Sequence, residues 1–527
     1  MLNLAVILEN SARERAEHPA IVFRDFRFTY RQIDDMANQV ANGLRNAGIR
    51  KGDKVALTCP NLPYFPIVYF GILKAGAVFV PLNVLLRPRE IAYHLNDSDA
   101  VAYICFEGTP ELPMAQYGYE GFKDSGTCER MWTIPMAPMG ESPIPGIPTL
   151  WELMGGQPTT FDTVQCRPDD TCVIIYTSGT TGRPKGAELT NSNMLLNCMV
   201  SRELIHGFPE DISLAVLPLF HSFGLSSILN TCVLGGATLI LLPRFDAGEV
   251  LRIFQDEGVT LFAGVPTMYW ELLNYPELDK FDIQKISSTL RLGVSGGAAM
   301  PVDVMSQFQE KFKIKILEGY GLSETSPTAS FNRVDIPQKV GSIGVPVWGV
   351  EMMVVDHDMN EMPVGKPGEI VIRGHNVMKG YYKRDEANDE AFQGGWFHTG
   401  DVGYKDEDGY FFIVDRIKDM IIRGGFNVYP REIEEVLMMH PDISLAAVIG
   451  VPHNEYGEEV AAFVIPQVGS KITPREIIEW SRTQMAAYKY PRTVEIVKTL
   501  PMGPTGKILK AELRNQRRET ASLRATS

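Results

Sequence analysis

The spacing of hydrophobic residues alternates between two periods along the first part of the chain. From Thr29 to Ile49, apolar residues at helical spacing form one face of a helix that ends at Gly48: Ile33, Met36, Val40 and Leu44. Short apolar runs at 54–60, 100–106, 171–176 and 261–266 indicate buried strands instead. Helical patterns lie between many of these runs, which indicates an α/β domain with parallel sheets covered by helices. In such sheets ligands bind at the carboxyl ends of the strands.

The pattern changes from about Lys339 onward. Short alternating runs with Gly and Asp turns at 341–356, 368–374 and 409–415 predict a small β-rich subdomain at about 340–414. After Asp415 the chain predicts a strand, a double glycine and a helix opened by Pro430. We therefore predict a large N-terminal domain over 1–414 and a smaller α+β C-terminal domain over 419–527.

Composition and charge narrow the class of protein. A chain of 527 residues is too long for one hydrophobic core, in keeping with two domains. The formal net charge of −14 argues against a nucleic-acid-binding surface. Seven cysteines without CxxC spacing indicate unpaired thiols in a reducing cytosol. The N-terminus lacks the features of a signal peptide, and no apolar run approaches the ~20 residues that span a bilayer. We expect a cytoplasmic protein.

The segment "YTSGTTGRPKG" (176–186) carries the first candidate chemistry. It does not fit the Gly-x4-Gly-Lys-Ser/Thr pattern, because Gly186 follows Lys185. Its hydroxyls, its backbone N–H groups and one cation can nevertheless hold phosphate oxygens, and its glycines permit close approach of the backbone. The predicted phosphate contacts are Thr177, Ser178, Gly179, Thr180, Thr181, Gly182 and Lys185. A flexible surface turn is the alternative.

Five further motifs accompany this loop, and together they carry a family resemblance. They are "LPLFHSFG" (217–224), "EGYGLSET" (318–325), "GWFHTGD" (395–401), "DRIKDMIIRGGFNVYPREIE" (415–434) and "PTGKILK" (504–510). Through them essentially the whole chain resembles the adenylate-forming enzymes, in the branch of the acyl-CoA synthetases and fatty-acid–CoA ligases. The resemblance implies that a carboxylate and ATP give acyl-AMP and pyrophosphate, and that the thiol of coenzyme A then displaces AMP.

The resemblance also implies roles for residues of the adenylation site. Glu324, with Thr177 as a hydroxyl partner, is expected to hold Mg²⁺, which prefers oxygen ligands. Lys507 is expected to bridge the attacking carboxylate and the α-phosphate, so that the small domain must swing onto the large one. The expected contacts with the nucleotide are Gly297, Ala298, Gly319, Tyr320, Gly321, Ser323, Asp401 and Arg416.

Further residues are expected to serve the acid, coenzyme A and the domain movement. His221, Phe223, Val294, Gly297 and Ala298 would line the acyl site, where His221 shapes and shields the centre. Arg244, Gly424 and Gly425 would contact coenzyme A, and Asp415 and Lys418 would form a hinge at 415–418.

The identity of the acid and of the thiol is less constrained. Small apolar walls favour an acyl or aryl acid, and we expect a medium- or long-chain fatty acid, with short-chain or aryl acids as the alternative. Free coenzyme A is the expected acceptor, although a stand-alone enzyme that loads a carrier protein is a second reading. A luciferase-like oxygenase and a non-catalytic nucleotide-binding protein are more distant alternatives. The sequence leaves a homodimer open.

Overall fold

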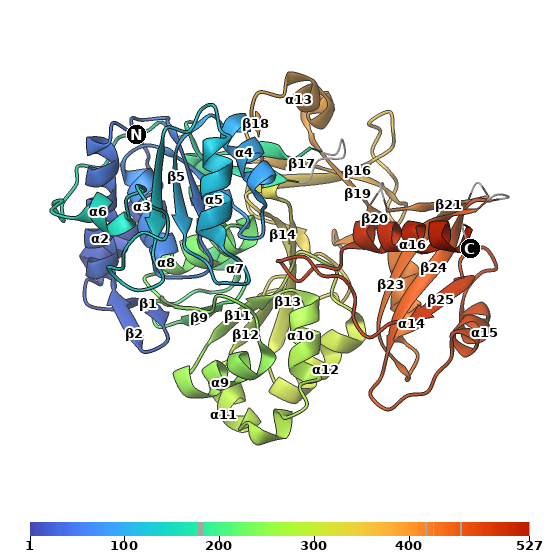
Figure 1. Ribbon diagram of the computed structural model, residues 1–527. Coiled ribbons are helices and arrows are strands. Elements are labelled where there is room, and N and C mark those ends of the chain that lie inside the picture. The colour runs from blue at the N-terminus through green and yellow to red at the C-terminus, as the bar shows by residue number, and fades with distance from the viewer. Residues whose placement is uncertain (178–182, 417–418, 425, 454–455, 526–527) are drawn as a thin grey trace.

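Two large sheets form the core of the N-terminal domain, with helices packed around them (Figure 1). The computed structural model describes residues 1–177, 183–416, 419–424, 426–453 and 456–525, and side chains as far as residue 517. The chain folds as the predicted α/β protein with a large N-terminal and a smaller C-terminal domain. None of the described helices is both long and apolar enough to cross a bilayer.

The first large sheet has nine strands, and its central pairs are parallel. Antiparallel pairs close both of its edges, β1 with β2 at one end and β13, β14 and β15 at the other. In spatial order the strands are β15 (Val345–Pro346), β14 (Thr328–Phe331), β13 (Lys315–Gly321), β12 (Leu292–Ser295), β11 (Leu261–Gly264), β9 (Ile212–Ala215), β10 (Thr238–Leu241), β1 (Pro19–Phe23) and β2 (Phe26–Thr29).

The second large sheet has seven strands, and five of them run parallel. Its central parallel strands are mainly apolar, as expected where helices cover both faces of a sheet, and every residue of β4 is buried. In spatial order they are β18 (Gly380–Tyr381), β8 (Lys185–Thr190), β7 (Thr171–Thr177), β4 (Val78–Leu82), β3 (Lys54–Thr58), β5 (Ala100–Phe106) and β6 (Arg130–Ile134).

The predicted helix near the N-terminus is confirmed as α2 (Tyr30–Asn46). The Thr29 side chain caps its first turn by accepting from Gln32 N, and Gly48 at φ +88° turns the chain after its end. The other helices of the N-terminal domain are α1 (Val6–Glu14), α3 (Tyr64–Lys74), α4 (Pro88–Asp97), α5 (Met114–Lys123), α6 (Leu150–Met154), α7 (Asn191–Leu204), η1 (Phe223–Asn230), α8 (Thr231–Gly235), α9 (Ala247–Glu257), α10 (Pro266–Leu273), η2 (Leu278–Lys280), α11 (Ile283–Thr289), α12 (Val302–Phe312), η3 (Ser323–Thr325), α13 (Asp385–Ala391) and η4 (Gln393–Gly395).

A third, antiparallel sheet lies where the sequence pattern changes. Its order is β16 (Val350–Val355), β17 (Gly368–Gly374), β19 (Phe397–Lys405) and β20 (Phe411–Arg416). Its inward residues Met352, Ile370 and Ile372 join a core cluster with Leu317 and Ala329 of the nine-stranded sheet. The β-rich segment is therefore packed onto the large domain.

The C-terminal part has its own core on both faces of a five-stranded sheet. Its strands are β22 (Phe426–Val428), β21 (Ile421–Arg423), β24 (Gly457–Pro466), β23 (Ile443–His453) and β25 (Thr493–Ile496), with helices α14 (Pro430–Met438), α15 (Pro474–Gln484) and α16 (Lys510–Ala525). Among the described residues, its two apolar clusters draw only on positions from 421 to 513. This separate core makes it a domain in its own right.

Among the described residues, side-chain hydrogen bonds join this domain to the large one at several separate points, one of them from Arg431 to Ile413 O at 2.7 Å. Trp270 Nε1 donates to Ser444 Oγ at 3.0 Å, and Thr267 Oγ1 donates to Gly506 O at 2.7 Å. Figure 1 shows the red segment between β25 and α16 reaching from the C-terminal domain toward β13 and β14. That segment contains Lys507, so the fold brings the end of the chain to the middle of the large domain.

Candidate active site

A cavity of about 750 Å³ lies at the carboxyl ends of β7, β12 and β13. This is the position at which parallel sheets bind ligands. The last residues of these strands line it, together with Pro504, Thr505 and Lys507 from the C-terminal domain. The cavity therefore has walls from both domains.

An acidic and hydroxyl-bearing cluster forms one end of this cavity. Thr177 Oγ1, at the end of β7, donates to Glu324 Oε1 at 3.0 Å, and the Tyr381 hydroxyl donates to the same oxygen at 3.0 Å. Lys185 Nζ lies 5.1 Å from the centre of the Tyr381 ring. A carboxylate, two hydroxyls and an ammonium group from three distant segments thus meet in one place.

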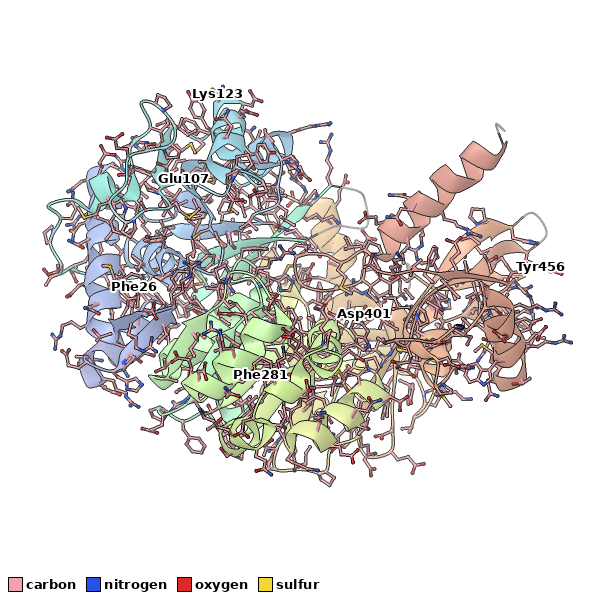
Figure 2. The ribbon with its side chains drawn as sticks, turned by 60° about the horizontal axis from the view of Figure 1, so that its bottom comes forward. Phe26, Glu107, Lys123, Phe281, Asp401 and Tyr456 are labelled. Carbon is pink, nitrogen blue, oxygen red and sulfur yellow. The ribbon has the colours of Figure 1, made fainter. Side chains whose placement is uncertain are left out.

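A second polar group surrounds Asp401, which Figure 2 places between the large lobe and the C-terminal domain. The Tyr320 hydroxyl donates to Asp401 Oδ2 at 2.6 Å, and Arg416 Nε lies 2.9 Å from Oδ1. Asp401 itself is only 2% exposed and lies behind Tyr320 and Arg416, which line the cavity. The Asp401 carboxylate raises the pKa of the Arg416 guanidinium, so Arg416 stays charged beside it.

The centre of the cavity is built around His221, Gly297 and Lys507. Burial lowers the pKa of His221 to about 3, and the nearby charge of Lys507 acts in the same direction. His221 Nδ1 accepts the Phe223 N–H at 3.3 Å, which leaves the proton of the neutral ring on Nε2. His221 is therefore a neutral hydrogen-bonding group at physiological pH.

Two glycines make room for this arrangement. Gly297 has φ +80°, and a Cβ atom there would lie 3.1 Å from Lys507 Cε. A Cβ atom on Gly321 would lie 1.7 Å from Pro327 O. Any side chain would therefore disturb the lysine at the first position and the backbone at the second.

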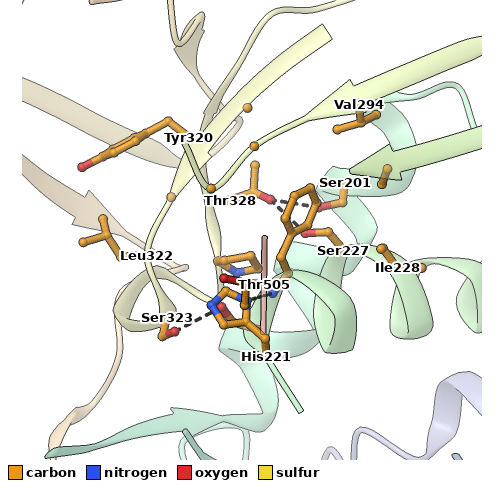
Figure 3. Close-up of a pocket in the computed structure, with 18 of the residues that line it drawn as sticks. Ser201, His221, Ser227, Ile228, Val294, Tyr320, Leu322, Ser323, Thr328 and Thr505 are labelled. Carbon is orange, nitrogen blue, oxygen red and sulfur yellow. Dashed lines mark hydrogen bonds between the residues drawn. The ribbon is translucent and has the colours of Figure 1, made fainter. Parts of the chain in front are cut away.

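The opposite end of the cavity is lined mainly by apolar side chains (Figure 3). Phe223 and Val294 stand next to the centre, and the lining continues between α7 and β9 as far as Phe208, whose side chain is 54% exposed. The further apolar lining residues are Leu204, Ile205, Leu214, Ile228, Leu261, Phe262 and Phe331. A long apolar group fits this end better than a charged one.

Comparison with known proteins places the chain in a family. The sequence model of the "AMP-binding enzyme" family matches residues 8–382, and that of the "AMP-binding enzyme C-terminal domain" matches residues 432–507. The chain belongs to the AMP-binding enzyme family.

The relatives of this AMP-binding enzyme are acid–CoA ligases. A feruloyl-CoA synthase of Amycolatopsis sp is 38% identical over 494 residues, which cover 93% of this chain and 94% of the relative. A long-chain-fatty-acid–CoA ligase of Bacillus subtilis (strain 168) is 36% identical over 536 residues, with 98% and 95% covered. The crystal structure of an anthranilate CoA ligase in complex with anthranoyl-AMP has a TM-score of 0.90 at 32% identity, with 99% and 98% covered. This enzyme is an AMP-forming acid–CoA ligase.

Most of the site residues expected from the sequence lie together at the cavity of this AMP-binding enzyme. Those that line it are Thr177, Lys185, His221, Phe223, Val294, Gly297, Gly319, Tyr320, Gly321, Ser323, Glu324, Arg416 and Lys507. Ser178, Gly179, Thr180, Thr181, Gly182, Lys418 and Gly425 lie outside the described residues.

Besides Asp401, which lies behind Tyr320 and Arg416, four expected residues do not line the cavity in this conformation. Ala298 is exposed, because the left-handed turn at Gly297 directs the chain away from the cavity. Arg244 is exposed in the loop between β10 and α9. Gly424 lies in the C-terminal domain, where its N–H donates to Tyr456 O at 2.8 Å. Asp415 also lies outside the cavity, and its carboxylate accepts the backbone N–H groups of Arg416 and Arg431.

Sequence reasoning missed two polar residues of this site. Tyr381 follows a short loop without a motif, and its role depends on a contact with Glu324, which is 57 positions away in the sequence. Ser222 Oγ lies 3.2 Å from Ser323 Oγ. In the sequence, only the position of Ser222 within the motif "LPLFHSFG" indicated that it lies near the site. Neither contact has a local sequence signal.

Glu318, directly before the cavity-lining Gly319, is a buried carboxyl group. Its Oε1 accepts the Met300 N–H at 3.0 Å, and its Oε2 has no hydrogen-bond partner among the described residues. Burial raises its pKa from the usual 4.5 to about 7, and Arg431 in α14 acts in the opposite direction.

We expect Glu318→Gln to stabilise the protein above pH 7. The folded state holds the Glu318 proton more tightly than the unfolded state, so the wild type loses stability as the pH rises from 4.5 to about 7. The neutral amide avoids this loss, which amounts to about 3 kcal/mol at most. Calorimetric unfolding midpoints of the two proteins should agree near pH 4.5 and separate as the pH rises. The exposed Glu310→Gln serves as the control, and a gap independent of pH would contradict the expectation.

Proposed function

We propose that this AMP-binding enzyme converts a medium- or long-chain fatty acid, ATP and coenzyme A into acyl-CoA, AMP and pyrophosphate. One observation carries the proposal: Lys507 of the C-terminal domain, the Thr177–Glu324 pair and the apolar end surrounding Val294 share one cavity. A nucleotide triphosphate and a carboxylic acid can therefore meet there with their reacting atoms adjacent.

In the first step a carboxylate oxygen of the acid attacks the α-phosphorus of ATP, and pyrophosphate leaves with the bonding electrons. Both reactants are anions, so the step needs positive charge at the point of attack. Lys507, which approaches Gly297 at the centre, is placed to hold the carboxylate against the α-phosphate. His221 remains neutral beside it and need not act as a base, because the acid is already ionised.

The residues present also fit a magnesium ion. Glu324 and Thr177 offer a carboxylate and a hydroxyl oxygen 3.0 Å apart on the cavity wall, which is the donor chemistry that Mg²⁺ prefers. When bound there, the ion would neutralise charge on the leaving pyrophosphate. Lys185 would contribute a further positive charge at the same end.

In the second step the thiol of coenzyme A loses its proton to water, its sulfur attacks the acyl carbonyl carbon, and AMP leaves with the electrons of the bond between that carbon and the phosphate oxygen. We propose that the C-terminal domain rotates about residues 415–418 between the steps, which would bring Gly424 and Gly425 to coenzyme A, while Arg244 would contact it from the large domain. The C-terminal domain packs its own separate core, which supports such a movement as a rigid body. Arg416, which Asp401 holds in place and which lines the cavity, would contact the ribose.

The apolar end of the cavity supports a fatty acid as substrate, because it reaches from the centre to the partly exposed Phe208. An aryl acid is the second candidate, which the similarity to the anthranilate CoA ligase and the feruloyl-CoA synthase favours. We place the reaction in the cytosol, since all seven cysteines are free and buried.

The acid should be identified by incubation with ATP, Mg²⁺, coenzyme A and single acids, followed by mass spectrometry. We expect acyl-CoA and AMP from dodecanoic and palmitic acid, and less product from acetic or benzoic acid. Product from aryl acids alone would replace the first candidate by the second. AMP without any acyl-CoA would favour a carrier protein as the acceptor, and no acid-dependent AMP would exclude the ligase.

Lys507→Ala should abolish mainly the first step. Removal of one charged group at the reacting phosphate costs on the order of 10²–10³ in rate. Acid-dependent pyrophosphate release should fall by that factor, whereas synthesis of acyl-CoA from supplied acyl-AMP should remain within about threefold of wild type, because Lys507 acts on the phosphate before AMP leaves. The exposed Lys498→Ala, in the same segment, is the matched control. Equal loss of both half-reactions would contradict this division of roles.

Glu324→Gln should weaken the binding of Mg²⁺. The amide keeps the shape of the side chain but loses its charge, so the Mg²⁺ concentration for half-maximal pyrophosphate release should rise about tenfold or more. Glu386→Gln on α13, an exposed carboxylate outside the cavity, controls for the change in net charge. An unchanged Mg²⁺ titration would remove Glu324 as a ligand.

A further inference from the structure

Three hydroxyl side chains come together in the wall of the apolar end of the cavity. Ser201 comes from α7, Ser227 from η1 and Thr328 from β14, and all three line the cavity. The Ser201 and Ser227 hydroxyl oxygens each lie 3.4 Å from Thr328 Oγ1. Figure 3 shows these three side chains as one group, apart from His221 and Ser323. We call Ser201, Ser227 and Thr328 the hydroxyl cluster.

The backbone fixes the position of this cluster. Thr328 N donates to Asn197 Oδ1 at 3.2 Å, and Thr328 O accepts from Asn197 Nδ2 at 2.8 Å and from Asn376 Nδ2 at 3.1 Å. Asn197 is fully buried and lies one turn before Ser201 on α7. The same amide side chain therefore holds the strand and the helix that carry two of the three hydroxyls.

The cluster has unused hydrogen-bonding capacity. Three hydroxyls offer three donors and six lone pairs, whereas the two contacts within the cluster use two donors at most. Both contacts are also longer than the 2.5–3.0 Å typical of O–H···O hydrogen bonds. The residues that line the cavity with the cluster include Phe223, Val294 and Phe331, which offer no polar side-chain atoms. A polar group enclosed by apolar walls is stabilised most by an occupant that brings an oxygen atom to it.

We propose that the hydroxyl cluster is a specificity subsite for an oxygen atom on the acyl group of the substrate. The preferred acid then carries a hydroxyl or ether oxygen at a distance from its carboxylate, on either an alkyl chain or an aromatic ring. This inference rests on the proposed function and refines its substrate class. The cluster acts by positioning the acyl group, while the reacting atoms meet at Lys507.

The inference is tested with matched pairs of acids that differ by one oxygen. In the alkyl arm, decanoic acid is compared with 10-hydroxydecanoic acid, and in the aryl arm, cinnamic acid with 4-hydroxycinnamic acid. For each pair the ratio of kcat/KM is measured for the wild type, Ser201→Ala, Ser227→Ala and Thr328→Val. Thr231→Val is the matched control, because Thr231 lines the same cavity but its hydroxyl donates to Ser226 O at 3.1 Å.

In at least one arm we expect the wild type to prefer the oxygenated acid by about tenfold, the factor of one net hydrogen bond. Thr328→Val should bring that ratio to about one and raise kcat/KM for the plain acid, since a methyl group replaces a hydroxyl of equal size. The control variant should keep the wild-type ratio. The arm that shows the preference identifies the source of the oxygen.

A wild type without preference in both arms overturns the subsite, as does a preference that survives Thr328→Val and both serine variants. Binding of the same acids is measured in parallel by equilibrium dialysis, which needs no turnover. If the wild type binds the oxygenated acid more tightly and Thr328→Val removes this preference, the subsite is supported even where no acyl-CoA forms. The missing acyl-CoA would then contradict only the proposed ligase activity. Equal binding of both acids of each pair overturns the subsite whatever the turnover.

Discussion

The close approach of Lys507 to Gly297 is the constraint on which the rest of the site depends. Lys507 lies in the segment between β25 and α16 of the C-terminal domain, and Gly297 lies two residues after the end of β12 in the large domain. Because position 297 has no side chain and adopts φ +80°, the lysine can enter the cavity next to His221. The bare backbone at position 297 thus leaves room for a side chain of the C-terminal domain at a cavity of the large domain.

The two ends of the cavity carry side chains of different chemistry, and different elements of the fold supply them. Strand ends and the loops that follow them supply charge and hydroxyls at one end, where Thr177 and Glu324 lie. Helices α7 and η1 supply the mainly apolar wall of the other end. The neutral state of His221 separates the two, because an imidazolium beside Lys507 would repel it. The cavity therefore has a charged end and a mainly apolar end, with the neutral His221 between them.

Local patterns in the sequence predicted the elements and the loops of the site, but not the contacts between distant segments. Helix α2 and the buried strands of both large sheets followed from spacing, and the motifs placed Thr177, Glu324 and Lys507 in one site. Ala298 was expected beside Gly297, yet the turn at Gly297 leaves it exposed. The sequence did not indicate Tyr381 or the hydroxyl cluster, because single serine, threonine and tyrosine residues carry no local signal. Only the fold brings them together, as Ser201 and Thr328 show, which are 127 positions apart.

The hydrogen bond from Trp270 to Ser444 gives the enzyme a built-in optical reporter. Trp270 is one of six tryptophans, and its indole reaches from the large domain to a serine of the small one. An indole that exchanges a protein acceptor for water changes its fluorescence. Each rotation of the C-terminal domain would thus alter the fluorescence emission of Trp270. Stopped-flow fluorescence would then report the timing of the proposed movement without an added dye.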